Sequence, residues 1–270
     1  MHRRSFLGLG AISSFGFSAA ATTNMLHAAA AAPKGSIIEL RHYSMRNSSD
    51  AQMQRTSEFI EKCALPAGKR AGEGVSGVFA NFIAPDGPFL LLVNSYPSLA
   101  AMESSQAKSA EDKEFQAALD AYYARPGLGY QRVKVTLLRA IDSMPVIEPP
   151  PPAEAGKGLR IFELRTYESN NAATLRRKVR MFEQGGELGI FRRVGIRPVF
   201  FGTALAGDNL PNLTYMVAYD DLAARDRAWK AFLADPEWLK LRAQPGLSDA
   251  EIVSNIGNVI LRPLPFSPVR

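Results

Sequence analysis

IIELRHY, at residues 37–43, recurs 124 positions later as IFELRTY, at residues 161–167. Further matches follow in the same order at a spacing of 123 residues. They pair residues 90–96, 112–115 and 137–139 with residues 213–219, 235–238 and 260–262. Self-similarity at a fixed period indicates repeated structural units. The sequence therefore predicts a tandem duplication, with one copy at 36–141, a second at 159–265 and a proline-rich linker at 142–158.

Each copy shows the same succession of hydrophobic patterns. Side chains alternate over the first strand of each copy, and an apolar stripe at Leu175, Val179 and Phe182 predicts a helix after that strand in the second copy. Two more strands, a helical region and a final strand are predicted at 75–83, 89–96, 98–124 and 132–140, and again at 197–204, 212–219, 221–243 and 257–262. The order β-α-β-β-α-β is that of a ferredoxin-like unit.

A ferredoxin-like sheet carries helices on one face only, so its other face needs a different cover. Two copies in one chain supply that cover for each other. We therefore expect an α+β fold of two tandem ferredoxin-like units, whose open sheet faces meet and close into a barrel-like pseudo-dimer within the chain.

Residues 1–32 have the character of an export signal. Arg3 and Arg4 precede a mildly apolar stretch rich in Gly, Ala and Ser, and a run of small residues leads to Pro33. This pattern indicates a secretory signal, and the paired arginines indicate the twin-arginine route. The predicted location is periplasmic or secreted. The apolar stretch is too short to leave a stable membrane span after signal removal, and an uncleaved anchor is the alternative.

The residues left after signal removal limit the kinds of partner and of metal or cofactor site that the protein can have. The formal net charge of +6 falls to about +4 without a large Lys/Arg cluster, so we expect no nucleic-acid partner. The single cysteine, Cys63, rules out an internal disulfide and a cysteine-based metal cage. Of three histidines only His42 lies beyond residue 32, and the strand alternation predicts that it faces the helices as a structural side chain. We expect no metal and no cofactor.

ELRTY at the start of the second copy, together with DPEW at residues 235–238, resembles the NIPSNAP family. The first copy keeps ELRHY but has DKEF, at residues 112–115, where proline and tryptophan are expected. The resemblance implies membership of the dimeric α/β-barrel superfamily. It implies no particular reaction, because the family has no generally agreed activity. Some members of the superfamily bind haem through a histidine, but we predict no histidine facing a cavity here.

Three polar side chains share one face of each repeated strand. They are Glu39, Arg41 and Tyr43 in the first copy and Glu163, Arg165 and Tyr167 in the second. If Leu40 and Leu164 face the helices, the polar sets face the space between the two sheets. There the arginines and tyrosines would bind a ligand, and Glu39 or Glu163 would be the candidate catalytic proton carrier. The alternative is that glutamate and arginine only pair with each other and fix the strand register.

Two functions remain open at this point. The first is an exported protein that binds a small aromatic or anionic molecule between its two sheets. The second is a cofactor-free enzyme of monooxygenase or isomerase type that uses the Glu/Arg/Tyr set. Assembly of the chain into a homo-oligomer is compatible with either function.

Overall fold

The computed structural model describes residues 35–151 and 160–270. The predicted export signal, and residues 152–158 of the predicted linker, lie outside the described residues. We call residues 35–151 the first half and residues 160–270 the second half.

The two halves present the same order of elements. The first half contains β1 (Ile37–Ser44), α1 (Gln52–Phe59), the π-helical segment η1 (Ile60–Ala64), α2 (Leu65–Ala71), β2 (Gly77–Ile83), β3 (Phe89–Tyr96), α3 (Leu99–Glu111), α4 (Lys113–Ala124) and β4 (Arg132–Ala140). The second contains β5 (Ile161–Glu168), α5 (Ala172–Glu183), α6 (Glu187–Arg193), β6 (Arg197–Ala206), β7 (Asn212–Tyr219), α7 (Leu222–Ala234), α8 (Pro236–Arg242), α9 (Asp249–Ile252) and β8 (Asn255–Pro263). Every predicted strand is present, and its ends differ from the prediction by no more than two residues.

The eight strands close into one antiparallel barrel in the order β1-β3-β2-β8-β5-β7-β6-β4. Within each half the first strand pairs with the third and the fourth. The halves meet at two seams, where β2 pairs with β8 and β4 pairs with β6. An α+β fold in which strands of both halves close one barrel is therefore confirmed.

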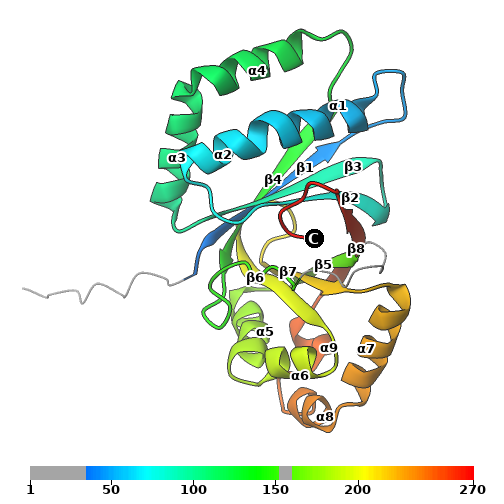
Figure 1. Cartoon of the computed structure of the whole chain (residues 1–270). Coiled ribbons are helices and arrows are strands. Elements are labelled where there is room, and N and C mark those ends of the chain that lie inside the picture. Colours follow the sequence, from blue (N-terminus) through cyan, green and yellow to red (C-terminus); the bar gives the residue numbers. More distant parts are fainter. Residues whose placement is uncertain (1–34, 152–159) are drawn as a thin grey trace, which may run out of the picture. The chain divides into compact units, whose positions relative to one another are not determined.

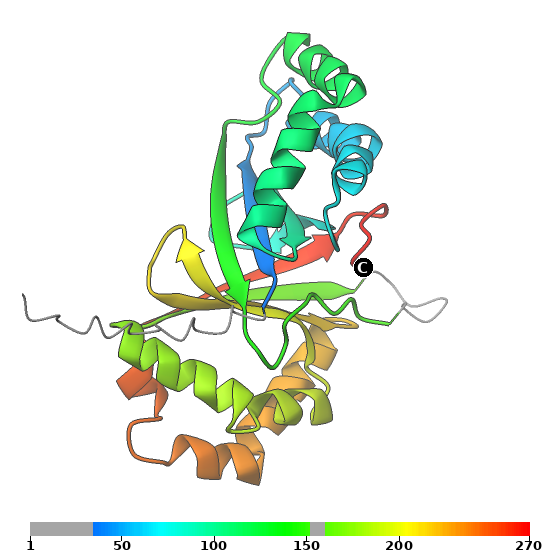
Figure 2. The same cartoon turned by 90° about the vertical axis from the view of Figure 1, so that its left-hand side faces the viewer.

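The helices lie on opposite sides of this barrel. Figures 1 and 2 both show α1–α4 on one side of the strands and α5–α9 on the other. Each set thus covers the outer sheet face of its own half. Among the described residues, no helix has the length and apolar character that crossing a membrane requires.

Aspartate caps divide the second helical region of each half at matching positions. In the second half the break lies at Asp235, since α7 ends at Ala234 and α8 begins at Pro236. The first half breaks in the same way at Asp112, although no proline follows it. Both aspartates are extended in backbone conformation, and their side chains accept hydrogen bonds from the first turn of the next helix. The cap is therefore sufficient to end one helix and start another.

The segment GEGVSG, residues 72–77, contains the spacing of a dinucleotide-binding loop but forms a different structure. Gly72 ends α2 in the left-handed conformation, with φ of 91°, and Gly77 begins β2. A phosphate-binding loop would instead follow a strand and open a helix. The segment is therefore a helix-to-strand turn.

The prediction that the Glu/Arg/Tyr sets face the space between the sheets is wrong. Ile38 and Leu40 of β1 pack in one cluster with Phe162 and Met216 of the other half, so this face points into the barrel. The interior of an eight-stranded barrel is narrow and largely occupied by side chains, and a charge buried there needs a partner. The polar sets therefore lie on the outer face, under the helices, where the second half provides charged partners for Glu163.

The predicted orientation of His42 is wrong for the same reason. His42 shares the inner face with Leu40, and its ring lies 4.2 Å from the ring of Phe89. It lines a pocket of about 320 Å³ together with Leu164 and Thr166. Burial lowers the pKa of its imidazole, despite the opposing charge of Asp86.

Candidate functional site

A cavity of about 530 Å³ lies between the outer sheet face and the helices of the first half. Its floor includes Arg41 and Tyr43 of β1 and Asn94 and Tyr96 of β3, and α1, η1, α2, α3 and α4 contribute to its walls. Many of the lining side chains are aromatic. The aromatic lining residues are Tyr43, Phe59, Tyr96, Phe115, Tyr122, Tyr123 and Tyr130. Ring-lined cavities with a few polar groups are typical of small-molecule sites.

A charged cluster lies at the floor of this cavity. Nη2 of Arg41 lies 2.9 Å from Oε1 of Glu39, which is itself buried. The hydroxyl oxygen of Tyr96 lies 3.2 Å from Oε2 of Glu39 and 3.0 Å from Oε1 of Glu73. A phenol has one hydrogen and can donate to only one of these carboxyl groups. Both contacts are hydrogen bonds when the other carboxyl group carries a proton and donates it to the hydroxyl oxygen of Tyr96.

Glu73 is the carboxyl group that best fits the protonated role. Burial raises its pKa, and the nearby charge of Glu39 raises it further, against the opposing hydrogen bond from Tyr96. Burial also raises the pKa of Tyr96, as do the charges of Glu73 and Glu39. Glu39, in contrast, is paired with Arg41. The cluster thus favours retention of a proton on Glu73, beside the cavity and next to the hydroxyl group of Tyr96.

The sequence of the second half identifies the family of that half. A family model described as NIPSNAP matches residues 162–268. This part of the chain is a NIPSNAP domain. It contains the ELRTY and DPEW motifs that carry the resemblance, so the predicted family is confirmed for it. No curated protein matches the chain at a significant level.

Solved structures resemble the chain in fold. A proposed monooxygenase from Fusobacterium nucleatum is 12% identical, with a TM-score of 0.55, over 85% of this chain and 93% of its own. A proposed monooxygenase from Lactobacillus acidophilus is also 12% identical, with a TM-score of 0.52, over 84% and 93% of the two chains. An uncharacterised NIPSNAP-like domain protein from Burkholderia xenovorans is 28% identical, with a TM-score of 0.36, over 40% of this chain and 89% of its own. The first two similarities show a shared fold only.

In the NIPSNAP domain both carboxylate oxygens of the corresponding polar set have donors. Glu163 is completely buried and accepts hydrogen bonds from Nη1 of Arg165, from Nε and Nη2 of Arg225, and from Nε1 of Trp229, at 2.7–3.1 Å. Arg165 also contacts the hydroxyl of Tyr167 at 3.3 Å. Burial opposes ionisation of Glu163, but the two arginines outweigh it and lower the pKa of Glu163. This geometry favours a structural role for Glu163, Arg165 and Tyr167.

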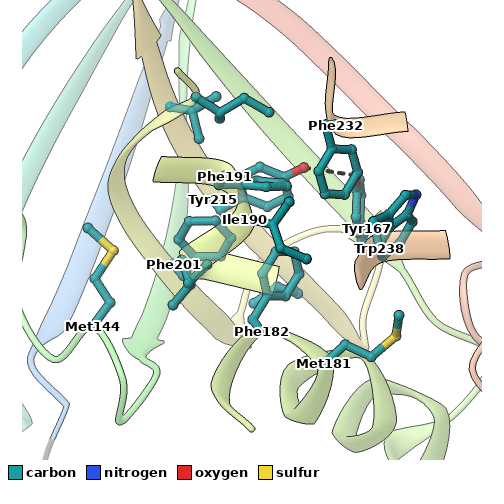
Figure 3. Packing of buried hydrophobic residues seen from close by; sticks show 14 of the residues in the cluster. Met144, Tyr167, Met181, Phe182, Ile190, Phe191, Phe201, Tyr215, Phe232 and Trp238 are labelled. Atoms are coloured by element: carbon teal, nitrogen blue, oxygen red, sulfur yellow. Dashed lines mark hydrogen bonds between the residues drawn. The ribbon is translucent and has the colours of Figure 1, made fainter. Parts of the chain in front are cut away.

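Aromatic rings fill the space between sheet and helices in the NIPSNAP domain. Figure 3 shows Phe182, Phe191, Phe201, Tyr215 and Phe232 packed against one another. The rings of Phe201 and Tyr215 stack at 4.5 Å, and Phe191 contacts Phe232 at 4.9 Å. Close packing of this kind is that of an ordinary protein interior.

The repeat explains why the first half is hollow at the same place. With the register of 123 residues that relates α3 to α7 and β3 to β7, smaller or more flexible side chains replace the large ones of the NIPSNAP domain. Gln106, Ser109, Gly68, Leu92 and Met102 stand in place of Trp229, Phe232, Phe191, Tyr215 and Arg225. A Cβ at Gly68 would collide with the carboxyl group of Glu73, so this glycine makes room for a polar group in the cavity.

The site residues predicted from the sequence thus lie in two different environments, one set at the cavity and the other in a filled core. Arg41 and Tyr43 line the cavity, and Glu39 lies beneath it against Arg41. Arg165, Tyr167 and Glu163 belong to the filled NIPSNAP domain. Glu73, Asn94 and Tyr96 also line the cavity and were not among the residues predicted from the sequence. A comparison of the copies could have found Glu73, because the matching residue in the second copy is the apolar Ile196.

Proposed function

We propose that the first half binds a small aromatic molecule in the cavity between its sheet and its helices. One observation carries this proposal: a ring-lined space of about 530 Å³ lies where the NIPSNAP domain is filled by its own aromatic side chains. The proposed ligand position therefore lies outside the barrel and under the helices, and not between the two sheets.

The charges at the cavity floor favour a neutral aromatic molecule over an anionic one. The guanidinium group of Arg41 is already paired with Glu39 at 2.9 Å. Glu73 adds a second carboxyl group on the cavity side. An anionic ligand would have to compete with Glu39 for Arg41, and unlike an apolar ring it would lose its hydration on entering.

Replacing Gln106 with tryptophan should close the cavity and abolish aromatic binding. Gln106 lines the cavity, and its counterpart Trp229 packs against Phe191 and Phe232 in the NIPSNAP domain. We expect naphthalene to bind the unmodified protein and to bind Gln106→Trp at least about tenfold more weakly, a change of about 1.4 kcal/mol. Equilibrium dialysis measures both affinities.

Glu103→Trp is the matched control, because Glu103 is exposed on the same helix and does not line the cavity. It should bind naphthalene as the unmodified protein does. The proposal is wrong if the unmodified protein takes up no naphthalene, or if Gln106→Trp takes up as much as the control.

A second candidate is a cofactor-free enzyme of monooxygenase or isomerase type, in which the cluster at the cavity floor moves a proton. The shared Tyr96 hydroxyl between Glu39 and Glu73 supports this candidate. General acid–base catalysis needs a group that holds a proton within reach of the substrate, and Glu73 lines the cavity. Glu73 then replaces Glu39 and Glu163 as the proposed proton carrier.

Glu73→Gln should reveal the proton that Glu73 holds. Because the pKa of Glu73 is raised in the folded state, its contribution to stability is present below its ordinary pKa and is lost as the pH rises through the raised value. Glutamine does not titrate. The variant should therefore gain stability relative to the unmodified protein as the pH rises above the ordinary range of a carboxyl group, as measured by thermal unfolding. If the difference in thermal stability between the two proteins does not change with pH, Glu73 is ionised throughout and holds no proton.

We also propose that the two halves are duplicated ferredoxin-like units that form a pseudo-dimer. The repeated order of elements and the matching aspartate caps support this origin. Export through residues 1–32 remains a separate proposal, which the mass of the chain recovered from the periplasm would test.

A further inference from the structure

In the NIPSNAP domain, the side chain of Trp229 occupies the place that a ligand ring would take in the first half. The indole ring of Trp229 lies under the guanidinium group of Arg165, with the guanidinium carbon 4.6 Å from the ring centre. The indole Nε1 donates to Oε2 of Glu163 at 3.1 Å. Trp229 thus stacks on an arginine and donates to that arginine's carboxylate partner, and it does so from a helix that has a counterpart in the first half.

The first half keeps the receptor groups for such a ring and lacks the ring itself. Glu39 and Arg41 reproduce the pair of Glu163 and Arg165, at 2.9 Å against 2.8 Å. Gln106 takes the position of Trp229 in the repeat, and Arg41 lines the cavity. The same guanidinium face is therefore available to a planar molecule from outside.

Within the described part of the chain, Nε of Arg41 is buried without an acceptor, as Nε of Arg165 is in the NIPSNAP domain, so the two halves differ in their hydrogen-bond acceptors. Arg225, which gives two hydrogen bonds to Glu163, is replaced by Met102, which gives none. Among the described residues, Oδ1 of Asn94 is buried without a hydrogen-bond donor, and Asn94 lines the cavity. Glu73 adds a further carboxyl group there. Buried acceptors without donors are costly, so a ligand that supplies N–H groups gains most at this floor.

We propose that the ligand of the first half is a planar nitrogen heterocycle with a ring N–H. Its ring stacks on the guanidinium group of Arg41, and its N–H donates to the carboxyl cluster of Glu39 and Glu73 or to Asn94. This inference rests on the proposed aromatic binding and adds the chemistry that the ligand must carry.

Three compounds of similar size test the inference on the unmodified protein. Indole has the ring N–H, benzofuran has an oxygen in its place, and naphthalene has no polar atom. We expect indole to bind at least about tenfold more tightly than benzofuran, because only indole satisfies the acceptors. Isothermal titration calorimetry measures the affinities, and Gln106→Trp should remove indole binding.

The outcomes separate this inference from the proposed function. Equal affinity for indole and benzofuran, with both lost in Gln106→Trp, would overturn the N–H requirement and leave aromatic binding in the cavity intact. No binding of any of the three compounds would overturn both. Indole binding that survives in Gln106→Trp would place the compound elsewhere and would also overturn the inference.

Discussion

Lys178→Met is expected to lower the free energy of unfolding by about 3–5 kcal/mol, the usual cost of removing one partner of a buried ion pair. Lys178 is 1% exposed, and its Nζ lies 3.3 Å from both carboxylate oxygens of Glu187. The rings of Tyr167, Phe182 and Trp238 surround the ammonium group at 5.0–5.2 Å. Methionine fills the space but leaves Glu187 buried without its cation.

The loss in Lys178→Met should depend on pH. Burial raises the pKa of Glu187 to about 7, although Lys178 opposes this rise. Without Lys178 the pKa should rise further. A carboxyl group with a raised folded-state pKa contributes stability that is lost as the pH rises through that pKa. The variant should therefore be less destabilised at pH 5 than at pH 8 in urea unfolding.

A double variant provides the control for this prediction. Lys178→Met combined with Glu187→Leu removes both charges, and an apolar pair of similar volume is often as stable as a buried ion pair. We expect it to recover most of the loss of the single variant. If the double variant is less stable than Lys178→Met, the pair is not the cause of the loss. If the single variant loses less than about 1 kcal/mol, the unpaired charge is relieved by water.

Glu163→Gln is expected to cost about 3 kcal/mol of stability, near the lower end for a buried ion pair because one of its partners, Arg225, reaches solvent. Glutamine has the shape of glutamate, but only its carbonyl oxygen accepts hydrogen bonds, and its NH2 group would face two of the donors that Arg165, Arg225 and Trp229 give to the carboxylate. Two guanidinium groups then share a buried site without a compensating charge. Urea unfolding measures the loss.

Glu39→Gln is the matched variant in the other half. Glu39 is the partner of a single arginine, and that arginine is 35% exposed, so the loss of stability should be much smaller. Glu39→Gln should instead weaken indole binding, whereas the effect of Glu163→Gln on stability should leave the affinity of the folded protein for indole unchanged. Equal losses of stability would contradict the view that the two polar sets have different roles.

The order and ends of the strands were predictable because they depend on local pattern. β3 and β7 are buried, mostly hydrophobic runs bounded by turns, and both were predicted with the ends that the structure shows. The break at Asp235 was predictable from Pro236. The equivalent break at Asp112 was not, because an aspartate cap without a proline is a weaker signal than the uninterrupted helical pattern around it.

The faces of β1 and β5 were not predictable from alternation alone. Alternation separates two faces but does not say which is inner, and here both are buried, with Leu40 on one and Glu39 on the other. The deciding contact, between Glu163 and Arg225, joins residues 62 positions apart. Such a pairing follows from the closed barrel and the docked helices and not from either segment by itself.

The cavity could not be predicted from the first copy alone. It exists because smaller side chains stand where the second copy has large aromatic ones. Gln106 and Ser109 do not look like site residues, and they matter because Trp229 and Phe232 occupy the same places in the other half. Glu73 lies within a glycine-rich helix-to-strand turn, where local pattern gives no sign of a site. Comparing the two copies position by position reveals such sites better than either copy alone.

We propose that the first half is open to an aromatic N–H ligand, whereas the second half is closed by its own Trp229. A crystal structure of the protein soaked with indole tests this most directly. We expect one indole per chain, stacked on Arg41 beside Glu73 and Asn94, with no indole under α7. An indole displacing Trp229 or lying beside His42 inside the barrel, or a cavity left empty at saturating indole, would contradict it.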